Sequence, residues 1–259
     1  MTPSYREAEM KLLNIDSNAK TIKGQKQGYM TAIMYLAPSD LSGTQLCPTA
    51  MLAGCRDTCL NTAGRGGMAA KNATMMAPNG TKIPNNTVQR ARLARTALFL
   101  TDKPAFMAQL VVEITAFIKK AGKKGLIPVV RLNGTSDIRW ENELIQENNI
   151  FELFPNIQFY DYTKIPNRKV SHIPNYHLTF SYSHRPEYAP IVVKALKHYG
   201  QNVNFAAVFH GAQPESFLGR AVINGDESDL RFLDVSGVTV ALTAKGRAKK
   251  DMGGFVVRL

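Results

Sequence analysis

The sequence lacks the long apolar runs that mark membrane segments. It has no stretch of about eighteen consecutive apolar residues, which is the length of a membrane-spanning helix. The first stretch, MTPSYREAEMKLLNID, also lacks the apolar core of a signal peptide. We therefore expect a cytoplasmic protein with no membrane partner.

Cysteine is equally scarce, with only three in 259 residues. A small odd number argues against the disulfide framework of secreted domains. In a reducing compartment, clustered thiols are more often metal ligands or catalytic groups. The hydrophobic content of 44% is enough for a substantial core, and we expect one domain over residues 1–259.

Acidic residues are outnumbered by basic ones, 20 against 32, which gives a formal net charge of +12. This excess favours anionic partners, either small molecules or a nucleic acid. The basic residues are spread along the chain and are not interleaved with aromatic side chains that stack on bases. A small anionic substrate is therefore our first expectation and nucleic acid the alternative. The sequence leaves the oligomeric state open.

From residue 87 onward, helical patterns and short apolar strands alternate. Helices are predicted for TVQRARLARTALFL (87–100), for 102–125 with Asp102 as N-cap, and for PEYAPIVVKALKHYG (186–200). The predicted strands are LIPVVRL, NIQFYDY, NYHLTFSY, NVNFAAVF, GRAVI and VTVAL. The alternation predicts parallel strands with crossovers, so an α/β fold in the form of a partial (β/α) barrel. Its core covers 87–259, and 1–86 is a cluster-binding segment that ends in a polar loop (71–86), a lid or an insertion.

Polar residues follow five of these strands, in the stretches RLNGTSD, FYDYT, FSYSH, FHGAQ and INGDESD. In a parallel barrel the carboxyl ends of the strands gather at one face, where active sites lie. The alternative is that these residues are ordinary turn formers. The candidates for proton transfer are His184, His210, Asp137 and Asp161. The candidates for substrate binding are Asn133, Ser136, Lys245 and Arg247.

All three cysteines, Cys47, Cys55 and Cys59, lie within thirteen positions, with the spacing C-x7-C-x3-C. Scattered thiols would indicate core filling, whereas clustered thiols indicate a shared ligand. If a helix begins at Pro48, Cys55 and Cys59 share one of its faces at i and i+4. All three sulfurs would then converge.

The chemistry of the ligand set favours iron over zinc. A structural zinc site needs four ligands, and this chain has no CxxC pair and no histidine before His172. An iron–sulfur cubane held by three thiolates leaves one iron without a protein ligand, and a substrate can bind there. We therefore expect a 4Fe-4S cluster bound by Cys47, Cys55 and Cys59, with zinc and unligated thiols as alternatives.

Three stretches resemble a widespread family of phage-encoded proteins, the gene-product-88-like family. They are LSGTQLCPTAMLAGCRDTCLNTAGRG, VVRLNGTSDIRWE and LTAKGRAKKDMGGFVV, and the resemblance runs from about residue 28 to the end. It implies a viral auxiliary protein that acts in the host cytoplasm. It brings no established reaction with it.

A second resemblance is to radical S-adenosylmethionine enzymes, which carry three cysteines in a loop of a partial (β/α) barrel. Their usual spacing is C-x3-C-x2-C with an aromatic residue before the last cysteine, whereas Thr58 precedes Cys59 here. The stretch RLNGTSD occupies the place of their Gly-Gly-Glu-type segment but has no glutamate. The resemblance implies a shared fold and leaves the cosubstrate open.

An open iron allows two kinds of catalysis. As a Lewis acid it would polarise a bound carbonyl or water, so our first expectation is hydrolysis of a small ester or thioester. The alternative is reductive cleavage of S-adenosylmethionine to a radical. A third possibility is a non-enzymatic nucleic-acid-binding or redox-sensing module, with Arg90, Arg92, Arg95 and AKGRAKK on phosphates.

Overall fold

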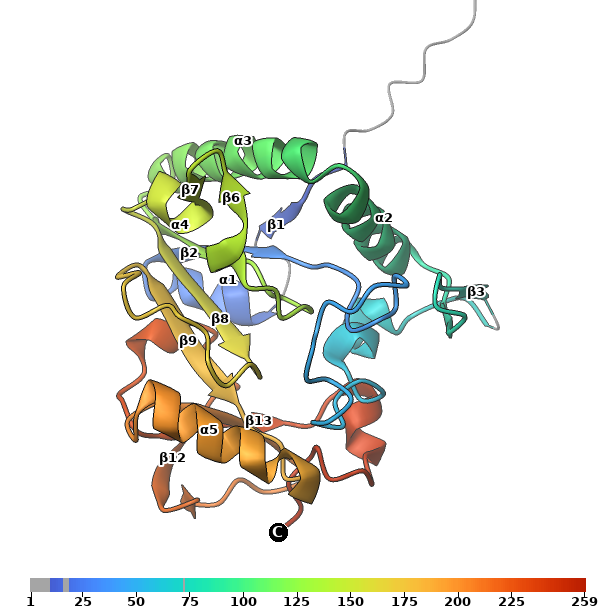
Figure 1. Cartoon of the computed structure of the whole chain (residues 1–259), viewed down its shortest axis with the longest axis vertical. Coiled ribbons are helices and arrows are strands. Elements are labelled where there is room, and N and C mark those ends of the chain that lie inside the picture. The colour runs from blue at the N-terminus through green and yellow to red at the C-terminus, as the bar shows by residue number, and fades with distance from the viewer. Residues whose placement is uncertain (1–9, 16–18, 72) are drawn as a thin grey trace, which may run out of the picture.

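The computed structural model describes residues 10–15, 19–71 and 73–259, and it contains a nine-stranded sheet at its centre (Figure 1). Six neighbouring strands follow their order in the chain and are all parallel. They are β2 (Tyr29–Met34), β5 (Ile127–Arg131), β8 (Gln158–Thr163), β9 (Tyr176–Ser181), β10 (Phe205–Phe209) and β13 (Thr239–Thr243). The predicted α/β class and all six predicted strands are confirmed, five of them in this parallel run.

Three further strands complete the sheet. β1 (Leu13–Ile15) pairs antiparallel with β2, β12 (Arg220–Asn224) pairs parallel with β13, and β11 (Ser216–Phe217) pairs antiparallel with β12. Among the described strands, β1 and β11 form the two edges, so the sheet is open and is not a closed barrel. Residues 1–86 thus supply β1 and β2 to the large sheet, in addition to the cysteines. These two strands were not predicted from the sequence.

The two long helices begin as predicted. Asn86 caps α2 (Thr87–Thr101) by accepting a hydrogen bond from the Gln89 amide at 2.9 Å. Asp102 caps α3 (Lys103–Gly122) by accepting from the Ala105 amide at 3.1 Å. Both caps satisfy amides that have no partner inside the helix.

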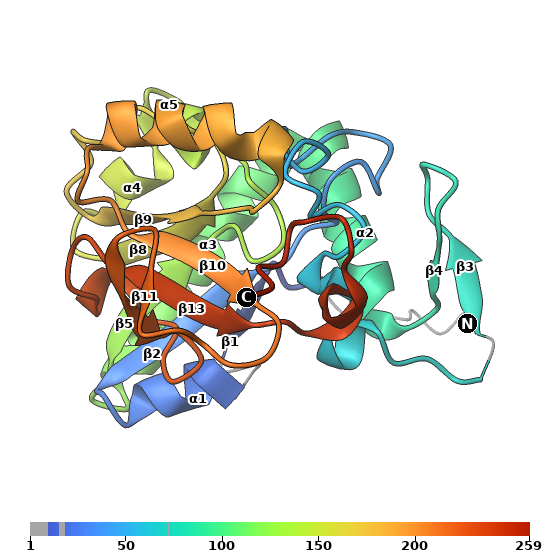
Figure 2. The ribbon, with the colours of Figure 1, turned by 90° about the horizontal axis from the view of Figure 1, so that it is seen from below.

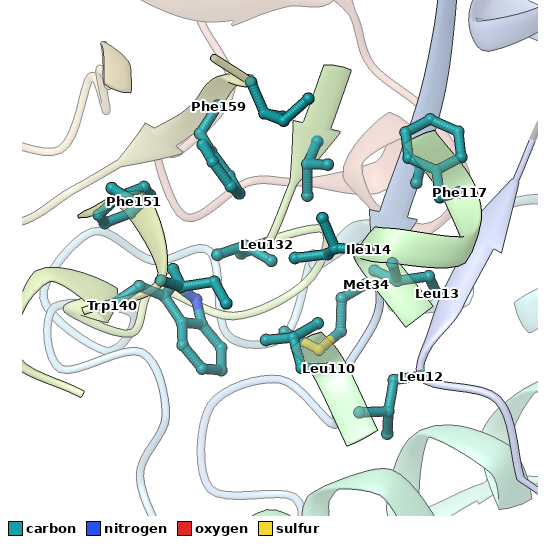
Figure 3. Packing of buried hydrophobic residues seen from close by; sticks show 14 of the residues in the cluster. Leu12, Leu13, Met34, Leu110, Ile114, Phe117, Leu132, Trp140, Phe151 and Phe159 are labelled. Atoms are coloured by element: carbon teal, nitrogen blue, oxygen red, sulfur yellow. The ribbon is translucent and has the colours of Figure 1, made fainter. Parts of the chain in front are cut away.

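One face of the sheet, which we call the outer face, is buried beneath α3, α4 (Ile150–Leu153) and α5 (Ala189–Tyr199). Figure 3 shows Leu110, Ile114 and Phe117 of α3 packed against Met34 of β2 and Leu132, which directly follows β5. Further along the same face, Phe180, Phe205 and Phe209 pack against α5. The apolar stripe of α3 formed by Leu110, Ile114 and Phe117 is therefore part of the core, as the helical spacing of these residues predicts.

The opposite face, which we call the inner face, is only partly covered. At its amino end, Val129 and Tyr160 pack against Leu230. Helix α1 (Ala19–Gln25) lies on this side, where Gly24 approaches Leu230, and Figure 2 shows α1 and α5 on opposite sides of the sheet. The carboxyl end of the inner face carries a cavity instead.

One expectation for the first part of the chain, the helix from Pro48, is wrong. In place of a helix from Pro48, residues 48–54 form successive turns, so Cys55 and Cys59 do not share a helix face. Ala, Met and Leu in PTAMLAGC favour a helix, but Gly54 has φ of +72°, in the left-handed region, so no right-handed helix can continue through it to Cys55. The polar loop 71–86 contains a hairpin of β3 (Thr74–Met76) and β4 (Lys82–Pro84). In the described part of the chain, no helix is long and apolar enough to cross a membrane.

Candidate active site

A cavity of about 230 Å³ lies at the carboxyl ends of the parallel strands, and all three cysteines line it. The floor of the cavity is formed by side chains on the inner face of the sheet, which alternate along each strand with the side chains of the outer core. Five neighbouring strands each contribute one of them: Arg131, Tyr162, Ser181, Val208 and Leu242. The pleat of each strand sends successive side chains to opposite faces, so an inner-face position near a strand end points into the cavity. Its location agrees with the predicted site at the strand ends.

The segment after β2 forms the opposite wall. It is held by turn hydrogen bonds, such as those from the Ala50 amide to Cys47 O at 3.0 Å and from the Cys55 amide to Ala50 O at 3.1 Å. Gly54 has φ of +72°, and a Cβ there would lie 2.6 Å from Cδ of Arg185, so only glycine fits.

The last part of the chain closes the cavity. The short helix η6 (Gly246–Lys250) lies beside the turn that contains Ala63, as Figure 2 shows in red and cyan. Ala248 and Phe255 line the cavity from this side. Residues about two hundred positions apart therefore enclose the same space.

Main-chain amides point at two of the sulfurs. Sγ of Cys47 accepts from the Ser39 amide at 3.3 Å, and Sγ of Cys59 accepts from the Asn61 amide at 3.5 Å. The thiol of Cys55 donates to Ala50 O at 3.8 Å. Such amides lower the cost of negative charge on sulfur.

Burial raises the pKa of all three thiols: well above the usual range for Cys47, upward for Cys55, and to about 11 for Cys59. The amide hydrogen bonds at Cys47 and Cys59 only partly offset this effect. The free thiols are therefore protonated at neutral pH. Binding of a metal centre would release these protons, because the thiolate is the ligand.

Among the described residues, no group of three or more histidine, cysteine or acidic side chains is arranged around a single metal ion. A tetrahedral zinc site with Zn–S bonds of about 2.3 Å needs its sulfurs roughly 3.8 Å apart. A four-iron cluster is larger and holds three thiolates farther apart. The donor set on this cavity is three thiols, which is the number of protein ligands that a four-iron cluster with one open iron requires.

Lys164 also lines the cavity, and the sequence analysis missed it. It directly follows β8 and lies two residues after Tyr162, so both side chains lie on the inner face of the sheet. This spacing of two residues was the signal in the sequence that could have identified it. Its Nζ donates to Ser181 Oγ at 2.7 Å, to Ser181 O at 3.1 Å and to Tyr182 O at 3.4 Å. It also lies 4.8 Å from the centre of the Phe255 ring. Burial lowers the pKa of Lys164, although the charges of Cys55 and Asp137 oppose the shift.

Asp137 is buried at the cavity wall, as predicted for a residue after β5. It accepts hydrogen bonds from the Lys164 amide at 2.7 Å and from Thr163 Oγ1 at 2.8 Å. Nη1 of Arg168 lies 3.7 Å from the same carboxylate. Burial raises the pKa of Asp137 and outweighs these contacts, which lower it.

Asp161 lies outside the cavity lining. It belongs to the outer-face register of β8, opposite Leu178, so the pleat turns it toward the helices. Its carboxylate accepts from the Asn133 amide at 2.8 Å and from the Tyr176 hydroxyl at 3.0 Å. Burial raises the pKa of Asp161 to about 7, against the effect of Arg131.

Asn133 and Ser136 line the cavity but are bound to their own loop. Oδ1 of Asn133 accepts from Ser136 Oγ at 2.9 Å, from the Ile138 amide at 2.9 Å and from Trp140 Nε1 at 3.1 Å. These bonds fold RLNGTSDIRWE into a compact turn. The two side chains shape the wall, and their predicted contact with a substrate stays a prediction.

The structure places both candidate histidines outside the cavity lining. His184 is exposed, and its Nδ1 lies 3.2 Å from the hydroxyl of Tyr182. His210 is also exposed, and its amide donates to Val257 O at 3.0 Å. Neither histidine lines the cavity that Asp137 shares with the three cysteines.

A further part of the cavity wall carries charge. Lys245 lines it, and its Nζ lies 2.8 Å from Oδ1 of Asp226, which Lys20 also contacts at 3.0 Å. Burial opposes ionisation of Asp226, but hydrogen bonds from Lys245 and Thr243 outweigh burial and lower its pKa. Arg131 completes the wall, with Nη1 3.2 Å from Asp229 and its guanidinium 4.7 Å from the Tyr162 ring centre.

The other predicted basic groups lie elsewhere. Arg247 is exposed on η6 and does not line the cavity. Arg92 and Arg95 are buried and donate to main-chain oxygens of Asn61 at 2.9 Å and of Lys11 at 2.6 Å. These two arginines hold loops together.

Comparison with known proteins gives a match along nearly the whole chain. The family model described as Gene product 88 matches residues 10–258, a range that includes the three cysteines and every strand of the large sheet. No curated protein and no solved structure matches the chain.

Proposed function

We propose that this chain, which belongs to the Gene product 88 family, is an iron–sulfur enzyme that acts on a small anionic molecule. Cys47, Cys55 and Cys59 would bind a 4Fe-4S cluster and leave its fourth iron facing the cavity. The observation that carries the proposal is that three thiols from one turn segment line one cavity at the ends of parallel strands. We place this activity in the cytoplasm of a phage-infected host.

We also propose that the six sequential parallel strands form a partial (β/α) barrel like that of radical S-adenosylmethionine enzymes. Those enzymes carry their three cysteines in a loop of the barrel, and here the cysteine segment is the loop that follows β2, the first of the six strands. This position supports the likeness, whereas the cysteine spacing differs. A loop that follows a parallel strand begins at the carboxyl end of that strand, so cysteines in such a loop would hold a cluster at the strand ends.

Hydrolysis is the first expectation from the sequence, but the position of the cysteine segment after the first of six parallel strands leads us to propose S-adenosylmethionine as the cosubstrate. When bound, the cluster would supply the electron that cleaves the sulfonium. The chain's own residues would bind and orient the molecule: Lys20 and Lys245 share the single carboxylate of Asp226, so together they leave one positive charge for the carboxylate of S-adenosylmethionine. Phe255 and Leu242 exclude water from the space between the walls.

Hydrolysis of a small ester or thioester is the second candidate, and a different observation favours it. Asp137 and Lys164 are titratable groups on the cavity wall, and burial raises the pKa of the first and lowers that of the second. Both shifts move toward neutrality, where proton transfer is most effective. The open iron would act as the Lewis acid when the cluster is bound.

Anaerobic purification with iron and sulfide counts tests the shared premise. Addition of S-adenosylmethionine to the dithionite-reduced protein then separates the candidates. The first expects a changed electron paramagnetic resonance spectrum and formation of 5′-deoxyadenosine. The second expects turnover of model thioesters without reductant. A colourless protein without iron would contradict both.

A further inference from the structure

We infer that Lys164 is the counter-charge of the cluster: its buried ammonium group raises the cluster's reduction potential. This inference rests on the proposed function, because it requires a cluster on the three cysteines. It assigns to Lys164 an electrostatic effect on the metal centre, separate from any proton transfer to a substrate.

The surroundings of Lys164 explain why its charge is available to the cluster. Its Nζ makes three hydrogen bonds, and all three acceptors are neutral oxygens of Ser181 and Tyr182. These bonds hold the ammonium beside the cavity without cancelling its charge. Asp137, the nearest acid, binds the main-chain amide of Lys164 and faces Arg168 as well.

The other cations around the cavity are already matched or directed elsewhere. Arg131 is paired with Asp229 at 3.2 Å. Lys20 and Lys245 share the carboxylate of Asp226. Arg92, the remaining cation near Cys59, donates to oxygens of Asn61. Among the described cations that line the cavity, Lys164 alone has no carboxylate within salt-bridge distance of its Nζ.

The charge of the cluster makes such a cation effective. A core with two positive charges and three thiolates carries one net negative charge, and reduction adds a second. Buried charge is costly unless it is compensated, and a nearby cation stabilises the more negative state most. Lys164 therefore favours the reduced form. The step is the transfer of one electron from dithionite to the cluster, with no bond made or broken.

The experiment compares the midpoint potential of the reconstituted full-length protein with those of Lys164→Met and Lys164→Arg, by spectroscopically monitored redox titration. In Lys164→Met we expect the ratio of reduced to oxidised cluster at a fixed potential to fall about tenfold, which is about 59 mV for one electron. Lys164→Arg keeps the charge and should stay within about twofold of the wild type.

Lys119→Met is the matched control, since it removes the same charge from the exposed end of α3 and should leave the potential unchanged. If Lys164→Met does not fold, Lys164→Gln replaces it, because its amide still donates to Ser181. A neutral variant with a full cluster and the wild-type potential would overturn this inference alone. A wild type without iron and sulfide would overturn the proposed function, so the two failures are distinguishable.

Discussion

The two walls of the cavity differ in how completely the protein satisfies its own polar groups. On the sheet wall, the Asn133 side-chain oxygen has three donors and the Asp137 carboxylate has a hydroxyl, an amide and a guanidinium nearby. On the cysteine wall, the sulfurs of Cys47, Cys55 and Cys59 make only contacts of 3.3–3.8 Å with main-chain groups, one of them from Cys47 Sγ to Thr135 O across the cavity. The sheet wall is therefore held by a dense set of side-chain hydrogen bonds, whereas the cysteine wall is held mainly by its main-chain turns.

The largest effect should come from removing a ligand on the cysteine wall. Cys47→Ala, Cys55→Ala and Cys59→Ala should each lose most of the bound iron and sulfide, because two thiolates cannot retain the cluster. Colorimetric iron and sulfide counts after anaerobic purification measure this loss. Thr49→Ala, which also alters the lining of this wall, is the control and should keep the cluster. Full iron in all three variants would remove the distinction between the walls.

Breaking the sheet wall should instead cost stability. The fully buried side chain of Arg168 pairs with Glu141 at 2.5 Å and with Asp137 at 3.7 Å. Arg168→Met leaves two buried carboxylates without their cation and should lower the free energy of unfolding by about 3–5 kcal/mol. Urea denaturation measures it, and adding Glu141→Gln should restore part of the loss. A change below about 1 kcal/mol would mean that this wall does not depend on the ion pair.

A pH series sharpens the same point at Asp161. Its folded pKa of about 7 exceeds the unfolded value of roughly 3.9. The folded protein therefore holds a proton that the unfolded chain releases between about pH 4 and pH 7. The stability contributed by this group is present at low pH and falls as the pH rises through that window, by roughly 4 kcal/mol in total.

Asp161→Asn should flatten this decline, as seen in urea midpoints at several pH values. The exposed Asp57→Asn variant is the control and should keep the wild-type slope. An unchanged slope in Asp161→Asn would show that Asp161 is ionised in the folded protein throughout this range.

The smallest effect is expected at the exposed histidines. His184→Ala and His210→Ala should each change the free energy of unfolding by no more than about 0.5 kcal/mol, since neither lines the cavity. Product formation in the assay that succeeds should also stay at the wild-type level. A variant that keeps its cluster but loses turnover would restore that histidine to the catalytic role predicted from sequence.

Regular periodicity made much of the sheet and helices predictable. The stripe of α3 from Phe106 to Phe117 and the cap at Asp102 are local signals, and the structure confirms both. Strand β2 was not predicted, because the residues from Met30 to Met34 are buried on both faces of the sheet. The alternation of apolar and polar residues that indicates a half-exposed strand is therefore absent. The short α1 contains Gly24 and three polar residues in its first turns, which weakens its helical pattern.

The site was predictable only in part, for a physical reason. Clustering in sequence brought the three cysteines together, and strand order placed Asp137 near them. The face of the sheet on which a side chain lies, however, depends on its position along the strand. Asp161 and Tyr162 are neighbours in the chain, yet only Tyr162 lines the cavity. The histidines failed to reach the cavity because they lie beyond the strand ends, where loops turn outward.

The placement of β13 bears on the order in which the protein is made. Although β13 comes after β12 in the chain, it lies between β10 and β12, and it supplies Leu242 to the cavity floor. A ribosome releases β10 and β12 before the strand that joins them, so a nascent chain holds a gap at this point until residues 239–243 emerge. The cavity is therefore completed only after β13 has been made, although the cysteine segment that forms its opposite wall comes much earlier in the chain.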